Sequence, residues 1–220
     1  MKKVLLGVGA VLGLTVVGVL GAAAMQPEVM HIERSATFAA APQDIGPYAS
    51  DLKLWAEWNP WKDLDPAMAI TYHTTTAGPG AWYSWTGNEK VGNGKMTVLT
   101  VADDKITHDL EFFEPWQSKS TISFTFAPEG ESTKVTWAMD ETLPFTGKVM
   151  SLFMDMDAML GADFEKGLTK LKPLAEGAAS TRKDGEAASQ AAADAAAAAL
   201  PVEGAPLDGA PVEAAPATTP

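Results

Sequence analysis

The feature that most constrains the fold is a series of six strand-like segments in the middle of the chain. They are residues 68–74, 81–86, 94–101, 105–113, 119–127 and 133–141, which are rich in β-branched and aromatic side chains or alternate apolar with polar ones. The stretches that separate them, such as AGPG, GNEKVGN and PEGES, contain the residues that turns require. Consecutive strands joined by short turns predict an antiparallel meander.

A further strand and two short helices are expected before this meander, and one long helix after it. Residues 29–39 alternate as a strand does, and residues 42–52 start with a proline near the first turn and an early aspartate, as helices do. A short helical turn follows and ends at Asn59, before a proline. Residues 147–176 space their apolar side chains by three and four, which predicts one amphipathic helix. The order β-α-α-β6-α predicts an α+β fold.

At this point the chain resembles the START-like (SRPBCC), helix-grip superfamily, and in particular its polyketide cyclase/dehydrase-type members. The resemblance covers roughly residues 33–174. It is carried by RSATFAAAPQDIGPYASDLKLWAEWNPW, by VTWAMDE and by LFMDMDAMLGADFEKGLTKLK. It implies a curved antiparallel sheet wrapped around the long C-terminal helix, with a cavity between them. The superfamily includes lipid binders, cyclases, hormone receptors and co-chaperones, so the fold alone does not choose a function.

Alternation along the strands assigns the side chains that face this cavity. In residues 105–113 the even-numbered positions share the apolar face. In the last two strands, Phe124 and Trp137 lie at the middle of the apolar face of their strand. Tyr83 and Trp85 alternate against Trp82 and Ser84, and the inward pair is left open. Ordinary core packing is the alternative for all of these residues. The predicted lining is Trp55, Trp58, Tyr83, Trp85, His108, Leu110, Phe112, Ile122, Phe124, Trp137, Met139, Phe153, Met156, Asp157 and Leu160.

Two polar residues stand out against the apolar faces. His108 lies between Ile106 and Leu110, and a rotation of 100° per residue places Asp157 near the middle of the helix stripe. Because buried charges are rarely left without a partner, we expect one or both to supply a polar contact in the cavity. They are also the catalytic candidates if the protein is an enzyme of the cyclase kind.

Three of the seven tryptophans lie within seven positions, in the stretch LWAEWNPW. Trp55 and Trp58 are three residues apart on the short helix and share one side of it, and Trp61 follows the proline that ends it. One interpretation is a structural plug of the core, with the indole N–H groups directed to carbonyls or water. The other is a ligand-contacting rim or an aromatic surface at a membrane.

The two ends of the chain differ in composition from the middle. Residues 1–27 contain Lys2 and Lys3 before an uncharged apolar run from residue 4 to 25, which predicts a transmembrane signal anchor. A signal peptide cleaved after Ala24 is the alternative. Either way, the lysines stay in the cytoplasm and the domain of residues 28–176 is exported, or secreted after cleavage. Residues 177–220 lack aromatic side chains and are expected to be disordered.

Charge and composition exclude several classes of function. The net charge of −12 and the lack of basic runs argue against a nucleic-acid partner. There is no cysteine, no phosphate-binding glycine loop and no HExxH spacing, and His31, His73 and His108 are dispersed. We therefore expect neither a metal site nor a cofactor.

These patterns predict a membrane-tethered domain that binds a small hydrophobic or lipid-like molecule between the sheet and the C-terminal helix. A polyketide cyclase/dehydrase-like enzyme is the first alternative. An envelope or stress module that acts through protein contacts is the second.

Overall fold

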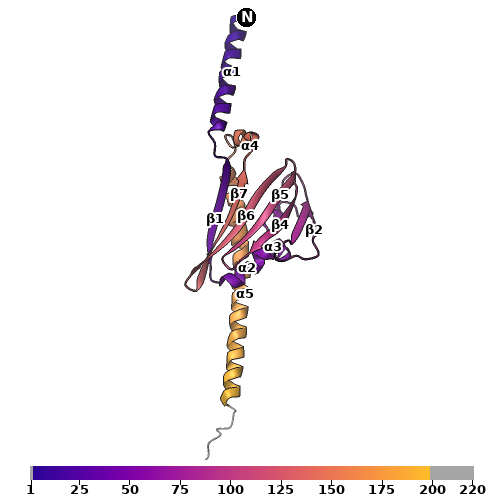
Figure 1. The fold of residues 1–220 in the computed structure, drawn as a ribbon, viewed down its shortest axis with the longest axis vertical. Helices are drawn as coiled ribbons and strands as arrows, with labels where there is room; N and C mark the ends of the chain where they lie inside the picture. Colours follow the sequence, from indigo (N-terminus) through magenta and orange to yellow (C-terminus); the bar gives the residue numbers. More distant parts are fainter. Residues whose placement is uncertain (1, 199–220) are drawn as a thin grey trace, which may run out of the picture. The chain divides into compact units, whose positions relative to one another are not determined.

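The sheet contains seven antiparallel strands, which are the six of the predicted meander and the strand expected before it. The computed structural model describes residues 2–198, with side chains from residue 11 onward. The strand order is β1-β7-β6-β5-β4-β3-β2, so that the first strand pairs with the last (Figure 1). The strands are β1 (Val29–Phe38), β2 (Ala69–Tyr72), β3 (Trp82–Thr86), β4 (Asn93–Val101), β5 (Lys105–Glu114), β6 (Ser118–Glu129) and β7 (Ser132–Thr142).

Three short helices carry the chain from β1 at one edge of the sheet to β2 at the other. They are α2 (Pro42–Ser50), α3 (Leu52–Trp58) and the 3₁₀ helix η1 (Pro60–Asp63). Side chains cap the N-termini of α3 and η1: the Lys53 N–H donates to Asp51 at 2.9 Å, and the Trp61 N–H donates to Asn59 at 2.9 Å. The two helices expected between the first strand and the meander are therefore present, and η1 adds a third turn.

Strand register places the apolar faces of neighbouring strands in one row. His108 lies opposite Ile122 of β6, and Ile122 lies opposite Met139 of β7. All three side chains are buried, as is Ile32, which lies opposite Met139 on β1. Alternation therefore predicted the inward face of these strands correctly. In β3 the inward pair is Tyr83 and Trp85, because both are buried.

The C-terminal helical region differs from the single helix expected over residues 147–176. It consists of α4 (Phe145–Met150) and α5 (Met156–Ala198), separated by residues 151–155. Asp155 accepts a hydrogen bond from the Ala158 N–H at 2.9 Å, so it caps the start of a new helix. The apolar spacing continues across this break, which explains the error. Phe153, predicted to lie on a helical stripe, lies in the connecting loop.

The expectation of disorder from residue 177 is corrected over residues 177–198, which are helical and continue α5. Alanine has the highest helix propensity, and side-chain pairs four residues apart support this part of the helix. Arg182 donates to Glu186 at 2.8 Å, and Gln190 donates to Asp194 at 2.7 Å. The chain separates into two compact units, Met1–Thr181 and Arg182–Pro220. The remainder of the predicted tail, residues 199–220, lies outside the described residues.

The N-terminal segment forms helix α1 (Lys2–Ala24). Among the residues that the structure describes, no helix combines the length and the apolarity that a membrane span needs.

Candidate ligand-binding groove

A groove of about 1520 Å³ lies between the inner face of the sheet and the first turns of α5. Strands β3 to β7 supply one wall, and Met156, Leu160 and Phe164 of α5 supply the other. Ligand pockets commonly enclose about 300–1,000 Å³, so the groove has room for a drug-sized or larger molecule. Ten residues of the predicted lining border it: Trp55, Tyr83, Trp85, Leu110, Phe112, Ile122, Trp137, Met139, Met156 and Leu160.

Five residues of the predicted lining do not border the groove. Trp58 and Phe124 are fully buried in the core beneath it. His108, Phe153 and Asp157 are elsewhere for different reasons. Phe153 is 72% exposed, because it follows α4 rather than lying on the buried side of a continuous helix.

His108 holds helix α2 against strand β5. Its side chain is fully buried, and Nε2 lies 2.8 Å from the carbonyl oxygen of Ala49, so this nitrogen carries the proton and donates it. Nδ1 is buried without a hydrogen-bond partner. Burial lowers the pKa of His108 to about 4, and the bond to the Ala49 carbonyl opposes this only in part. His108 is therefore a neutral core residue and cannot exchange protons with a molecule in the groove.

Asp157 faces away from the groove and pairs with Arg34 on β1. Its two carboxylate oxygens each accept a hydrogen bond from the Arg34 guanidinium at 3.0 Å. The same guanidinium donates to Glu165, about two turns further along α5, at 3.0 Å. The Arg34 hydrogen bonds lower the pKa of Asp157. Residue 157 is one position, or 100°, beyond Met156 in the groove wall, so it lies at the margin of the apolar stripe and not in its middle.

The tryptophan stretch closes the inner end of the groove. The rings of Trp55 and Trp58 are 4.4 Å apart and meet edge to face, and each lies 5.4 Å from the ring of Trp137 on β7. Trp137 stacks on Phe164 of α5 at 4.2 Å with an interplanar angle of 6°. The Trp58 indole N–H donates to the carbonyl of Tyr48 at 3.0 Å. Because Trp55 and Trp58 are buried, the plug interpretation fits and an aromatic surface made by these two residues does not.

Sequence reasoning missed several residues of the groove. Met96 on β4 and Phe164 on α5 border it, as do Trp61 and Asn59 from the start of η1. Met96 shares the buried side of its strand with Val98, so the same alternation argument that placed β5 could have found it. Phe164 was on the predicted helical stripe but one turn beyond the residues chosen. Trp61 is brought back over the groove by its indole N–H, which donates to Asp163 at 3.1 Å.

The inner part of the groove is apolar and aromatic. Tyr83 is a buried titratable group there, and burial raises the pKa of its phenol well above the usual range, so the hydroxyl keeps its proton. The Trp137 indole N–H is buried without a hydrogen-bond partner. Two carboxylates that border the groove are engaged by neighbours: Glu141 accepts from Ser120 at 2.8 Å, and Glu114 accepts from Asn93 at 2.7 Å. Within the described residues, no three metal-ligating side chains come together.

A curved antiparallel sheet that packs on a long C-terminal helix, with an apolar groove between them, defines the helix-grip class of proteins. The family model described as "Polyketide cyclase / dehydrase and lipid transport" matches residues 29–176 of this chain. The chain therefore belongs to this family, in agreement with the resemblance that its sequence motifs indicated.

Several solved structures are similar to this chain. One is the Aha1 dimer from Colwellia psychrerythraea, at 16% identity, a TM-score of 0.49, and coverage of 67% of this chain and 96% of that one. Another is protein CV1439 from Chromobacterium violaceum, at 13% identity, a TM-score of 0.48, and coverage of 69% and 99%. A third is the di-domain ARO/CYC protein StfQ of the steffimycin biosynthetic pathway, at 16% identity, a TM-score of 0.48, and coverage of 67% and 51%. No curated protein matches the sequence.

Proposed function

We propose that this protein binds a small hydrophobic or lipid-like molecule in the groove between the sheet and α5. The observation that carries the proposal is the groove itself, which holds about 1520 Å³ and is walled by side chains such as Trp85, Leu110, Phe112, Met139 and Leu160. The buried part of the groove wall is apolar and aromatic, which favours a ligand that gains affinity by leaving water. The family to which the chain belongs is consistent with this activity.

The cyclase-like alternative lacks the residues on which it depended. His108 is sealed in the core, and Asp157 is paired with Arg34 outside the groove. Acid–base catalysis requires a group within hydrogen-bonding reach of the substrate, and neither residue meets this condition. The proposal is therefore binding, with catalysis through His108 or Asp157 set aside.

We also propose that the apolar segment of residues 4–25 keeps the domain at a membrane, with the domain on the exported side. The support comes from the amino-acid sequence, in which Lys2 and Lys3 precede an uncharged run of apolar residues. Protease treatment of intact and of opened cells tests this arrangement. A domain that the protease cleaves only after the cytoplasm is opened would contradict the arrangement.

A photoactivatable fatty acid tests the groove. The full chain is reconstituted in phosphatidylcholine vesicles, illuminated with this probe, and analysed by mass spectrometry to locate the labelled residues. We expect labels on Leu110, Phe112 and Leu160. The variant Leu160→Trp fills the groove and should weaken labelling about tenfold, which corresponds to about 1.4 kcal/mol. The matched variant Leu99→Trp changes an exposed residue outside the groove and should leave labelling unchanged.

Labelling that is spread over the outer surface, or that Leu160→Trp leaves intact, would contradict the proposal. A groove that takes up no apolar probe while the protein captures a specific protein partner would favour the alternative of an envelope module.

A further inference from the structure

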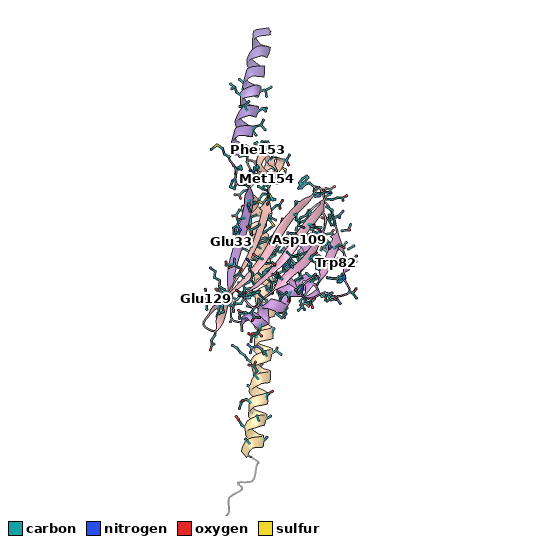
Figure 2. The ribbon with its side chains drawn as sticks, in the orientation of Figure 1. Glu33, Trp82, Asp109, Glu129, Phe153 and Met154 are labelled. Atoms are coloured by element: carbon teal, nitrogen blue, oxygen red, sulfur yellow. The ribbon has the colours of Figure 1, made fainter. Side chains whose placement is uncertain are left out.

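Exposed apolar side chains gather at the mouth of the groove. They come from the end of β5 and the turn after it, from α4, and from the loop between α4 and α5, where Figure 2 labels Phe153 and Met154 beside α4. Trp116 is 64% exposed and Phe153 is 72% exposed. We call this set the apolar rim: Phe113, Trp116, Phe145, Met150, Phe153 and Met154. Helix α4 has no buried residue at all, so its apolar side chains are not explained by the core.

The apolar rim is continuous with the groove. Phe113, Trp116, Met150 and Met154 belong both to the rim and to the residues that border the groove. Soluble proteins rarely expose large contiguous apolar patches, and those that do use them for binding. Other exposed apolar residues of the domain, such as Leu99 and Val101 on β4, are not among the residues that border the groove.

The chain from the N-terminal apolar segment enters the domain at the rim. The Leu143 N–H donates to the carbonyl of Glu28 at 2.9 Å, so the residue before β1 lies beside the residues that start α4. Helices α1 and α4 are in contact. Met25 ends the apolar run, and three residues can span at most about 11 Å. Whatever apolar phase holds residues 4–25 is therefore within reach of the rim.

The charges near the rim decide which surface fits it. Lys148 is the basic residue of α4, whereas Glu114 and Asp155 flank the rim segments, and the whole chain carries a net charge of −12. A surface rich in anionic lipids attracts clusters of lysine and arginine, which this region lacks. Aromatic and methionine side chains instead fit the boundary between headgroups and acyl chains of a bilayer with little net charge.

We propose that the apolar rim inserts into the interfacial layer of a lipid bilayer and places the mouth of the groove against the lipid. An apolar molecule then passes between bilayer and groove without crossing water, which removes the cost of hydrating it. This inference rests on the proposed membrane tether and on the groove as the binding site. It identifies the bilayer itself as the source or the destination of the ligand.

The lack of cysteine makes a single-residue test possible in the full chain. The variants Phe153→Cys and Trp116→Cys place an environment-sensitive fluorophore on the rim. Leu99→Cys is the matched control on an exposed apolar residue of the sheet, and Val16→Cys reports on the N-terminal segment. Each labelled protein is reconstituted in phosphatidylcholine vesicles. Fluorescence is then quenched either with spin-labelled lipid or with aqueous iodide.

We expect spin-labelled lipid to quench residues 16, 116 and 153 at least about threefold more than residue 99, and iodide to show the reverse order. Quenching of residue 16 alone would overturn the rim inference and leave the tether standing. Equal behaviour at all four sites would overturn both. The measurement is repeated at less than one chain per vesicle, where two copies cannot meet. If the rim fluorophores then lose their protection from iodide, the rim contacts a second copy and the inference is wrong. Fatty-acid labelling of the same samples reports separately on the groove.

Discussion

Gly167 allows α5 to approach the tryptophan cluster, and Gly167→Ala tests the packing that closes the groove. A Cβ atom at this position would lie 2.6 Å from Cζ3 of Trp137 and 3.4 Å from Cδ of Pro60. The Trp137 ring has no room to retreat, because it is fully buried, stacks on Phe164 and contacts the rings of Trp55 and Trp58. Overpacking of such a core costs about 1–3 kcal/mol.

The gain in helix propensity offsets part of this cost. Replacing glycine by alanine inside a helix is worth about 1 kcal/mol. We therefore expect Gly167→Ala to lower the free energy of unfolding by about 1–2 kcal/mol, since the contact is at the severe end of the range. Gly177→Ala makes the same change in the same helix where nothing lies within 4 Å, and it should stabilise by about 0.5–1 kcal/mol.

Urea denaturation followed by tryptophan fluorescence measures both variants against the natural sequence. A difference of about 1.5–3 kcal/mol between the two variants supports the arrangement of α5, Trp137 and Pro60. If Gly167→Ala is as stable as Gly177→Ala, helix α5 does not lie on the Trp137 ring, and the reasoning about the closed inner end of the groove is refuted.

Three further predictions follow from the ionisable residues. Because burial lowers the pKa of His108 to about 4, the unfolded chain takes up a proton near pH 6.5 that the folded chain does not. The free energy of unfolding should therefore fall by about 3 kcal/mol as the pH drops from 6.5 to about 4. Urea denaturation of His108→Gln over the same pH range should not show this fall. Gly161→Ala would place a methyl group where the Arg34 guanidinium lies and move it away from Asp157 and Glu165, so in a double-mutant cycle the change should be less favourable in the natural chain than in an Arg34→Ala chain. Hydrogen bonds from Lys166 and Lys170 lower the pKa of Asp63 to about 2 from a usual 3.8. The stabilisation by these ion pairs is present above pH 3.8 and is lost as the pH falls toward 2. An NMR titration of Asp63 should show a midpoint near pH 2. If the midpoint stays there in a chain with Lys166→Gln and Lys170→Gln, the two lysines are not the cause of the low pKa.

The two polar candidates show how long-range contacts limit sequence reasoning. Alternation placed His108 on the inward face correctly, but only the position of α2 shows that its Nε2 meets the Ala49 carbonyl instead of a ligand. Asp157 was assigned to the apolar stripe from helical spacing alone. Its partner Arg34 is 123 residues away in the chain. The Asp157 side chain lies outside the groove because it pairs with Arg34, and helical spacing does not reveal this contact.

The break in the C-terminal helix shows a second limit. Apolar spacing of three and four runs through residues 147–176, so the sequence indicated one helix. Asp155 can cap a helix or lie on its surface, and the sequence alone does not distinguish these. In the structure Asp155 caps α5, residues 151–155 form a loop, and Phe153 and Met154 become part of the exposed rim. The surface on which the membrane inference rests could not be predicted for this reason.

The sequence by itself determined the class of fold, the succession of the strands and the inward faces of β5, β6 and β7. These features follow from local patterns, because turn residues and a period of two specify where a strand ends and which side is buried. The tertiary structure decided which inward residues leave space and which fill it. Trp85 and Leu110 border the groove, whereas Phe124 and His108 lie in the filled core, although all four are buried. The difference arises from where α2, α3 and α5 lie against the sheet, and the placement of those helices depends on contacts between residues far apart in the chain.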